Sequence, residues 1–147
     1  MKLLSYHENG IYIVWGVDEK QDLRLLHVSS LPFQKEDIKV ESMDYGFRFV
    51  ELQLSGFDRP YERHGNKYIV TAPGYRMKYV SHSESRNENG LQLLFVLRDD
   101  LTDVYVDAYV QFYDGLAIVR MWQVIRNEGT ETQTVEYISG FNYEGIE

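Results

Sequence analysis

The dipeptide Asp114-Gly115 separates two runs rich in β-branched and aromatic side chains, and this arrangement constrains the fold more than any other part of the sequence. The runs cover residues 104–113 and 116–125. Asp-Gly between two such runs is a strong signal for a two-residue β-hairpin, because a type I′ turn needs a positive φ at both central residues. We therefore expect Tyr113 to pair with Leu116 and both strands to extend outward from that turn.

The alternation of side chains along this hairpin predicts one apolar face and one aromatic face, since successive side chains of a strand point to opposite sides. The apolar face of the first strand carries Val104, Val106, Ala108, Val110 and Phe112. The opposite face of the hairpin carries Tyr105, Tyr109 and Trp122 among both polar and apolar residues. Aromatic side chains with a polar tip favour half-buried contact surfaces. We interpret this second face as a surface that meets another layer or subunit, with stacking on a sugar ring as the alternative.

Further turn signals divide the rest of the chain into short strands. Asn9-Gly10 predicts a hairpin of residues 3–8 and 11–17, and Asn89-Gly90 and residues 127–130 mark two more turns. Additional strands are expected at residues 23–27, 47–54, 68–71, 75–83, 91–97 and 133–139, and loops at 29–39 and 56–67. No segment shows an apolar period of 3.6 over ten residues, which disfavours helices. The pattern predicts an all-β fold, an antiparallel β-sandwich.

Composition narrows the classes of function. The chain has 147 residues, enough for one domain over residues 1–147. Its net charge of −8 disfavours a nucleic-acid partner, which binds a basic face. The absence of cysteine excludes disulfides and thiolate chemistry. No apolar run is long enough to span a membrane and the first residues do not form a signal peptide, so we expect a cytoplasmic protein.

The sequence carries no motif for metal or nucleophilic chemistry. The four histidines (His7, His27, His64 and His82) lie far apart and at no zinc-binding spacing. Asp99, Asp100 and Asp103 cluster at a turn, where acidic residues ordinarily cap and solvate the backbone. No Gly-x-Ser-x-Gly elbow and no glycine-rich phosphate loop occur. We therefore predict no catalytic residue, no metal and no cofactor for this chain.

One polar loop, residues 56–67, is a candidate binding element. Its hydrogen-bonding side chains include Asp58, Arg59, Tyr61, His64 and Lys67. Loops with such content are frequent binding elements, although a merely solvated loop explains the composition equally well.

Four segments resemble the N-terminal domain of family 36 glycoside hydrolases, the bacterial α-galactosidases or melibiases. The segments are residues 49–56 (FVELQLSG), 73–82 (PGYRMKYVSH), 111–122 (QFYDGLAIVRMW) and 136–141 (EYISGF). The resemblance implies a β-sandwich of the supersandwich, galactose-mutarotase-like type, followed by a catalytic (β/α)8 barrel that carries the catalytic aspartates. It also implies that the sandwich packs on its own barrel and on neighbouring subunits of a homo-oligomer.

The same resemblance bears on the polar loop, which in the family can reach toward a neighbouring subunit's active site. The chain has His64-Gly65-Asn66-Lys67 of the family's His-Gly-x-Lys-His pattern, but Tyr68 replaces the last histidine. We therefore predict a non-catalytic domain of an α-galactosidase-like hydrolase that acts on terminal α-galactosyl groups. Two alternatives remain: a free-standing carbohydrate-binding module and a structural interaction domain of another hydrolase.

Overall fold

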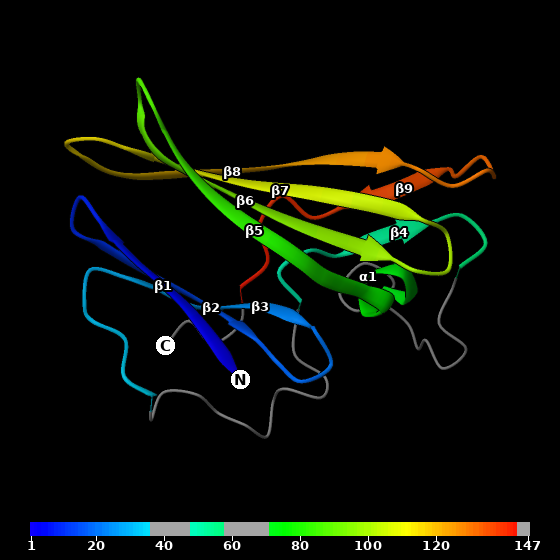
Figure 1. Ribbon diagram of the computed structural model, residues 1–147, viewed down its shortest axis with the longest axis horizontal. Coiled ribbons are helices and arrows are strands. Elements are labelled where there is room, and N and C mark those ends of the chain that lie inside the picture. The colour runs from blue at the N-terminus through cyan, green and yellow to red at the C-terminus, as the bar shows by residue number, and fades with distance from the viewer. Residues whose placement is uncertain (36–47, 58–70, 144–147) are drawn as a thin grey trace.

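The structure is a computed structural model that describes residues 1–35, 48–57 and 71–143 (Figure 1). The elements in chain order are β1 (Lys2–Glu8), β2 (Ile11–Val17), β3 (Leu23–Ser29), β4 (Leu52–Leu54), α1 (Ala72–Arg76), β5 (Met77–Asn87), β6 (Gly90–Asp99), β7 (Val104–Tyr113), β8 (Leu116–Asn127) and β9 (Val135–Ile138). They form sheets in the orders β1-β2-β3, β4-β9 and β5-β6-β7-β8, and every pairing is antiparallel. This confirms the predicted all-β fold of the sandwich type.

The core lies between the three-stranded and the four-stranded sheet, which face each other in Figure 1. The predicted apolar face of β7 is buried along its whole length, from Val104 to Phe112. Trp15 of β2 lies at the centre, with its ring 5.8 Å from that of Phe49 and 4.8 Å from that of Phe95. All three rings are fully buried. Burial of large aromatic side chains such as these supplies much of the hydrophobic stabilisation of a small core.

The two hairpin turns differ in geometry. Asn9 and Gly10 have φ values of 51° and 83°, as a type I′ turn requires. At the second turn only Gly115 has a positive φ, of 78°, so the predicted type I′ geometry is wrong there. Tyr113 pairs with Leu116 as expected, but Phe112 then pairs with Val119 across a bulge. The predicted pairing is therefore shifted by two residues, and the two faces keep their members because the side-chain period is also two.

Two predicted strands near the middle of the chain are wrong in extent, and a third lies mostly outside the described residues. Only Leu52–Leu54 of residues 47–54 forms a strand, and residue 47 lies outside the described residues. The expected strand 68–71 also lies outside them except for Thr71, which caps helix α1 by accepting a hydrogen bond from the Gly74 N–H. Because this cap and Pro73 begin a helix, β5 starts at Met77 rather than at residue 75.

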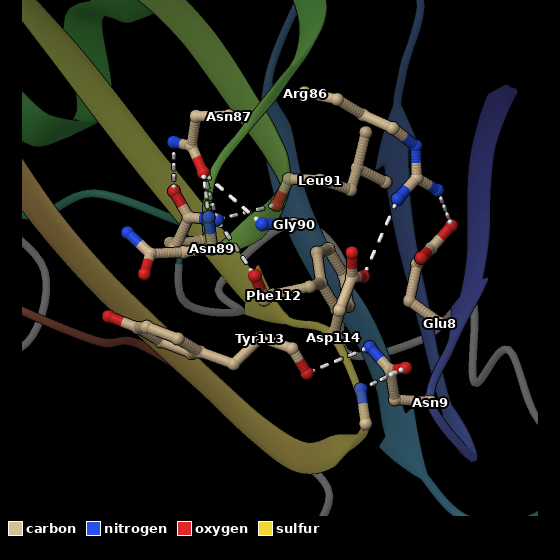
Figure 2. A network of polar contacts seen from close by, with 12 residues as sticks. Glu8, Asn9, Arg86, Asn87, Asn89, Gly90, Leu91, Phe112, Tyr113 and Asp114 are labelled. Carbon is tan, nitrogen blue, oxygen red and sulfur yellow. Dashed lines mark hydrogen bonds and ion pairs between the residues drawn. The ribbon is translucent and has the colours of Figure 1, made fainter.

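Polar contacts join the two sheets where their hairpins end (Figure 2). The side-chain amide of Asn9 donates to the Tyr113 carbonyl at 3.0 Å and accepts from the Gly115 N–H at 2.9 Å. Arg86 of β5 donates to Glu8 of β1 at 2.8 Å. The Asn9 contacts tie the β1–β2 turn to the β7–β8 turn, and the Arg86 contact ties β5 to β1.

The same edge of the sandwich is closed further along β1 and β5. The Tyr6 hydroxyl of β1 donates to Glu84 of β5 at 2.8 Å. Burial, together with that hydrogen bond, raises the pKa of Tyr6. The hydroxyl of Tyr79 lies 2.8 Å from Nδ1 of His82, next along β5. One edge of the sandwich is thus sealed by polar side chains.

Candidate functional site

The aromatic face predicted for the hairpin lies on the outer side of the four-stranded sheet. Tyr105, Tyr109 and Trp122 are all half-buried there. Because of the shifted register, Tyr109 lies directly opposite Trp122. Their rings stack with centroids 5.0 Å apart and an interplanar angle of 4°. The structure therefore brings two of the three predicted residues into direct contact.

The third aromatic residue, Tyr105, lies between two arginines. Arg98 of β6 and Arg126 of β8 are its cross-strand partners on either side. Their guanidinium carbons lie 5.7 Å and 4.9 Å from the centre of the Tyr105 ring. Cations at this distance interact favourably with the face of an aromatic ring. The three side chains form a ladder across three strands.

Carboxylates hold both arginines in place. Arg126 binds Asp107 through two hydrogen bonds of 2.7 and 3.0 Å, and Glu128 through one of 2.6 Å. Arg98 makes an ion pair with Asp103. These hydrogen bonds raise the pKa of each guanidinium, so both remain charged over the whole accessible pH range.

This arrangement decides what the aromatic face can do. The Trp122 ring also has the Arg120 guanidinium 5.3 Å from its centre. A sugar ring binds by stacking on an open aromatic face, and here arginines and a second ring already lie against these aromatic side chains. Trp, Tyr and Arg are the residues most enriched at the centres of protein interfaces. The face is better suited to contact with protein than to stacking with a sugar.

The five residues predicted from the polar loop lie outside the described residues. They are Asp58, Arg59, Tyr61, His64 and Lys67. Their role stays a prediction.

A buried charged cluster was missed by sequence reasoning. Asp22 is 2% exposed and accepts a hydrogen bond of 2.8 Å from Arg48, which is 3% exposed. Lys78 also binds the Asp22 carboxylate. The Arg48 guanidinium lies 4.3 Å from the centre of the Tyr75 ring. The cluster joins the turn before β3, the segment before β4, helix α1 and β5. No local pattern could have revealed it, because its members are far apart in the sequence.

Beside this cluster, Glu51 is fully buried and binds the N-cap of α1. A Cβ at Gly74 would lie 2.3 Å from Glu51 Oε2 and 2.3 Å from Thr71 Oγ1, so only glycine fits there. Burial raises the pKa of Glu51, against the opposing effects of the Thr71 hydrogen bonds and the Arg48 charge. The tight packing indicates a structural role for this carboxyl group.

The described histidines each have a local contact. The His7 ring stacks on Tyr12 at 3.8 Å, and His27 Nε2 lies 2.8 Å from the Leu31 carbonyl oxygen. Within residues 1–35, 48–57 and 71–143, no three His, Cys, Asp or Glu side chains are grouped so that they could hold a metal ion. In those same ranges no helix is long and apolar enough to cross a bilayer.

An apolar pocket of about 510 Å³ lies at the other edge of the sandwich, away from the polar contacts of β1 and β5. It is lined by Ile11, Val28, Val119, Met121, Gly140 and Phe141. Its lining has no charged side chain. The pocket can therefore bury apolar groups, but it presents no side chain for catalysis.

Comparison with known proteins finds similar folds among solved structures. No protein-family model matches the chain, and no curated protein matches it. The fold is similar to GH36 α-galactosidase AgaA from Geobacillus stearothermophilus, with a TM-score of 0.60 and 11% identity over 88% of this chain and 23% of that chain. A variant of AgaA in complex with raffinose gives a TM-score of 0.56 and 12% identity over 87% of this chain and 22% of that one.

A second enzyme of the same organism gives the same result. GH36 α-galactosidase AgaB aligns with a TM-score of 0.56 and 10% identity over 89% of this chain and 23% of that chain. The chain thus spans less than a quarter of the length of the enzymes that it matches. At this level of identity the comparison establishes the fold: this chain has the β-sandwich fold found within GH36 α-galactosidases.

Proposed function

We propose that residues 1–147 form a non-catalytic β-sandwich domain of a larger, cytoplasmic α-galactosidase-like glycoside hydrolase. In this proposal the parent enzyme hydrolyses terminal α-galactosyl groups with retention, and its catalytic aspartates lie on a (β/α)8 barrel that follows this domain. The domain supports the barrel and takes part in subunit contacts. Neither a cofactor nor a metal is required of it.

The observation that carries the proposal is the extent of the structural match. Nearly the whole of this chain superimposes on part of AgaA, and that part is 23% of the enzyme. A match of this kind is typical of one domain of a multidomain protein.

The aromatic face supports a role in protein contact. It combines Tyr105, Tyr109 and Trp122 with Arg98 and Arg126, which are paired with carboxylates. Side chains already ordered before binding lose less conformational entropy on association, which favours a protein partner for such a surface. We assign this face to contact with the remainder of the parent enzyme, and α-galactosides to the parent rather than to this domain.

One assay of the 147-residue chain and one reading of the coding sequence test the proposal. We expect no turnover of an aryl α-galactoside, measured beside an intact α-galactosidase as positive control. Turnover that copurifies with the chain would show that the domain is catalytic. The coding sequence beyond Glu147 gives an independent test, because a following barrel with two catalytic aspartates is expected and an immediate stop codon contradicts a parent enzyme.

A carbohydrate-binding module is the second candidate, favoured only by the partial exposure of the Tyr109–Trp122 pair. Titration calorimetry with melibiose and raffinose separates the two. We expect no measurable heat, and binding that is lost in Trp122→Ala would support the module instead.

A further inference from the structure

Two hairpin turns of this chain carry the same tripeptide, Glu-Asn-Gly, in different surroundings. The first is Glu8-Asn9-Gly10 between β1 and β2, and the second is Glu88-Asn89-Gly90 between β5 and β6. A large aliphatic residue follows in both cases, Ile11 and Leu91. Because the local sequences match so closely, a difference in chemical reactivity between the two asparagines has to come from the fold.

Asparagine followed by glycine is prone to spontaneous loss of its side-chain amide. The backbone nitrogen of the glycine attacks Cγ of the asparagine, since glycine has no side chain that obstructs the approach. A bond forms between this nitrogen and Cγ, the bond from Cγ to Nδ2 breaks, and ammonia leaves with the proton that the backbone nitrogen loses. Water then opens the cyclic succinimide at either carbonyl, which yields aspartate or isoaspartate.

The fold holds the Asn9 side chain at both of its polar atoms (Figure 2). Nδ2 donates to the Tyr113 carbonyl at 3.0 Å, and Oδ1 accepts from the Gly115 N–H at 2.9 Å. Attack by the Gly10 nitrogen makes Cγ tetrahedral and expels Nδ2, so both contacts have to break. Two hydrogen bonds of ordinary strength slow such a step roughly tenfold or more. The Asn9 amide is therefore protected.

The Asn89 side chain lacks this protection. The residue is exposed, and its side-chain amide makes no hydrogen bond with any residue that the structure describes. Only its backbone takes part in the network: the N–H donates to Asn87 Oδ1 at 2.9 Å, and the carbonyl accepts from the Asp114 N–H at 2.8 Å. These backbone contacts leave the amide able to rotate toward the Gly90 nitrogen.

One contact opposes the reaction at Asn89. Gly90 is buried, and its N–H donates to Asn87 Oδ1 at 3.2 Å. The same oxygen also accepts from the Asn89 N–H and, at 3.3 Å, from Gln111 Nε2. An amide oxygen has two lone pairs, so three donors share it and the long bond from Gly90 is weak. Burial of Gly90 does not separate the reacting atoms, because the attack is intramolecular.

We propose that Asn89 is a site of spontaneous deamidation in the folded protein and that Asn9 is protected from it. Conversion places a new carboxylate beside Glu88 in the β5–β6 turn. In the isoaspartate form the main chain is longer by one carbon and runs through Cγ. This changes the turn that places the Asn89 carbonyl against the Asp114 N–H, so the modification weakens the link between the β5–β6 and β7–β8 turns.

Peptide mapping by mass spectrometry tests the proposal, because the acid differs in mass from the amide. One sample of the chain is incubated folded in mildly alkaline buffer and a second in the same buffer with urea. Both are then digested briefly with pepsin at acidic pH. The protection of each asparagine is its rate in urea divided by its rate in the folded chain. We expect the protection of Asn9 to exceed that of Asn89 about tenfold or more. Equal protection of both residues, or greater protection of Asn89, would overturn the proposal.

A substitution provides a second measurement. Glutamine closes the corresponding larger ring more slowly, so Asn89→Gln should remove most of the isoaspartate that enzymatic methyl transfer detects in the folded chain after incubation. Asn142→Gln is the matched control, because tyrosine rather than glycine follows Asn142, and it should accumulate isoaspartate like the wild type. Unchanged isoaspartate in Asn89→Gln contradicts the assignment of the site.

Discussion

Glu51 accepts two hydrogen bonds from Thr71, one from its backbone N–H at 2.9 Å and one from its hydroxyl at 2.7 Å. Both end on the same carboxylate oxygen, Oε2. The other oxygen, Oε1, is buried and has no hydrogen-bond partner among the residues that the structure describes. The carboxyl group therefore stabilises the start of helix α1. Burial of its second oxygen without a hydrogen bond opposes this stabilisation.

This burial predicts a characteristic pH dependence. Burial raises the pKa of Glu51 above its ordinary value, so the folded state holds its proton more tightly than the unfolded state does. The resulting stabilisation is fully present below the unfolded pKa and is lost as the pH rises through the raised pKa. Glu51→Gln removes this titration. We expect the unfolding free energy of the variant minus that of the wild type to increase from about pH 4 to about pH 8.

Urea unfolding at several pH values measures this difference. Glu88→Gln, in the exposed β5–β6 turn, is the control for the removal of a surface carboxylate. A Glu51→Gln difference that is flat or that falls with rising pH would be inconsistent with a raised pKa.

The buried cluster around Asp22 predicts a large loss of stability. Asp22→Asn leaves the Arg48 guanidinium, which is 4% exposed, without its carboxylate. Removing one partner of a buried ion pair costs about 3–5 kcal/mol, because the remaining charge is buried without compensation. Urea unfolding at neutral pH measures the change.

An exposed ion pair provides the control for Asp22. The Asp100 side chain is 77% exposed and lies 3.3 Å from Arg98. Asp100→Asn should cost less than about 1 kcal/mol, as exposed pairs usually do. Similar small losses for both variants would show that the Asp22 cluster does not contribute to stability.

The parts of this fold that could be predicted are those encoded locally. The Asn9-Gly10 and Asp114-Gly115 dipeptides and the alternation in β7 determined the hairpins and the buried face, because turn residues and side-chain period act over a few positions. The same alternation identified the aromatic face. The bulge between Phe112 and Tyr113 was not predictable, since it depends on how the turn matches the twist of both strands.

The remaining features depend on contacts between distant parts of the chain. Helix α1 has only five residues, too few for an apolar period, and its cap binds Glu51 twenty positions away. The hydrogen bond from Arg48 to Asp22 joins positions 26 apart, and that from Lys78 joins positions 56 apart. The cation–ring ladder at Tyr105 requires the register of β6 as well as of β8. Sequence reasoning identified the ring but could not identify the arginines against it.

The link between the two hairpin turns predicts different effects for two substitutions of Asn9. Asn9→Gly removes the hydrogen bonds to Tyr113 and Gly115 but keeps the backbone conformation. It should cost about 1–2 kcal/mol. Asn9→Ala removes the same bonds and also forces alanine to adopt a φ of 51°. This conformation adds about 1 kcal/mol for a residue with a Cβ. Thermal or urea unfolding measures both, and equal stability of the two variants would contradict the role of the backbone.

A double-mutant cycle tests the stacked rings of Tyr109 and Trp122. Their near-parallel arrangement at 5.0 Å predicts a coupling of about 0.5–1.5 kcal/mol between Tyr109→Ala and Trp122→Ala. The stabilities of both single variants and of the double variant, measured by urea unfolding, give this coupling.

Tyr109→Ala combined with Leu101→Ala is the control cycle. These two changes should be additive within about 0.5 kcal/mol, because Tyr109 lies on β7 and Leu101 in the turn before it, far from each other. A coupling no larger than the control would mean that the two rings do not stabilise each other. The aromatic side chains would then be free to reorient toward a ligand, which would favour the carbohydrate-binding alternative.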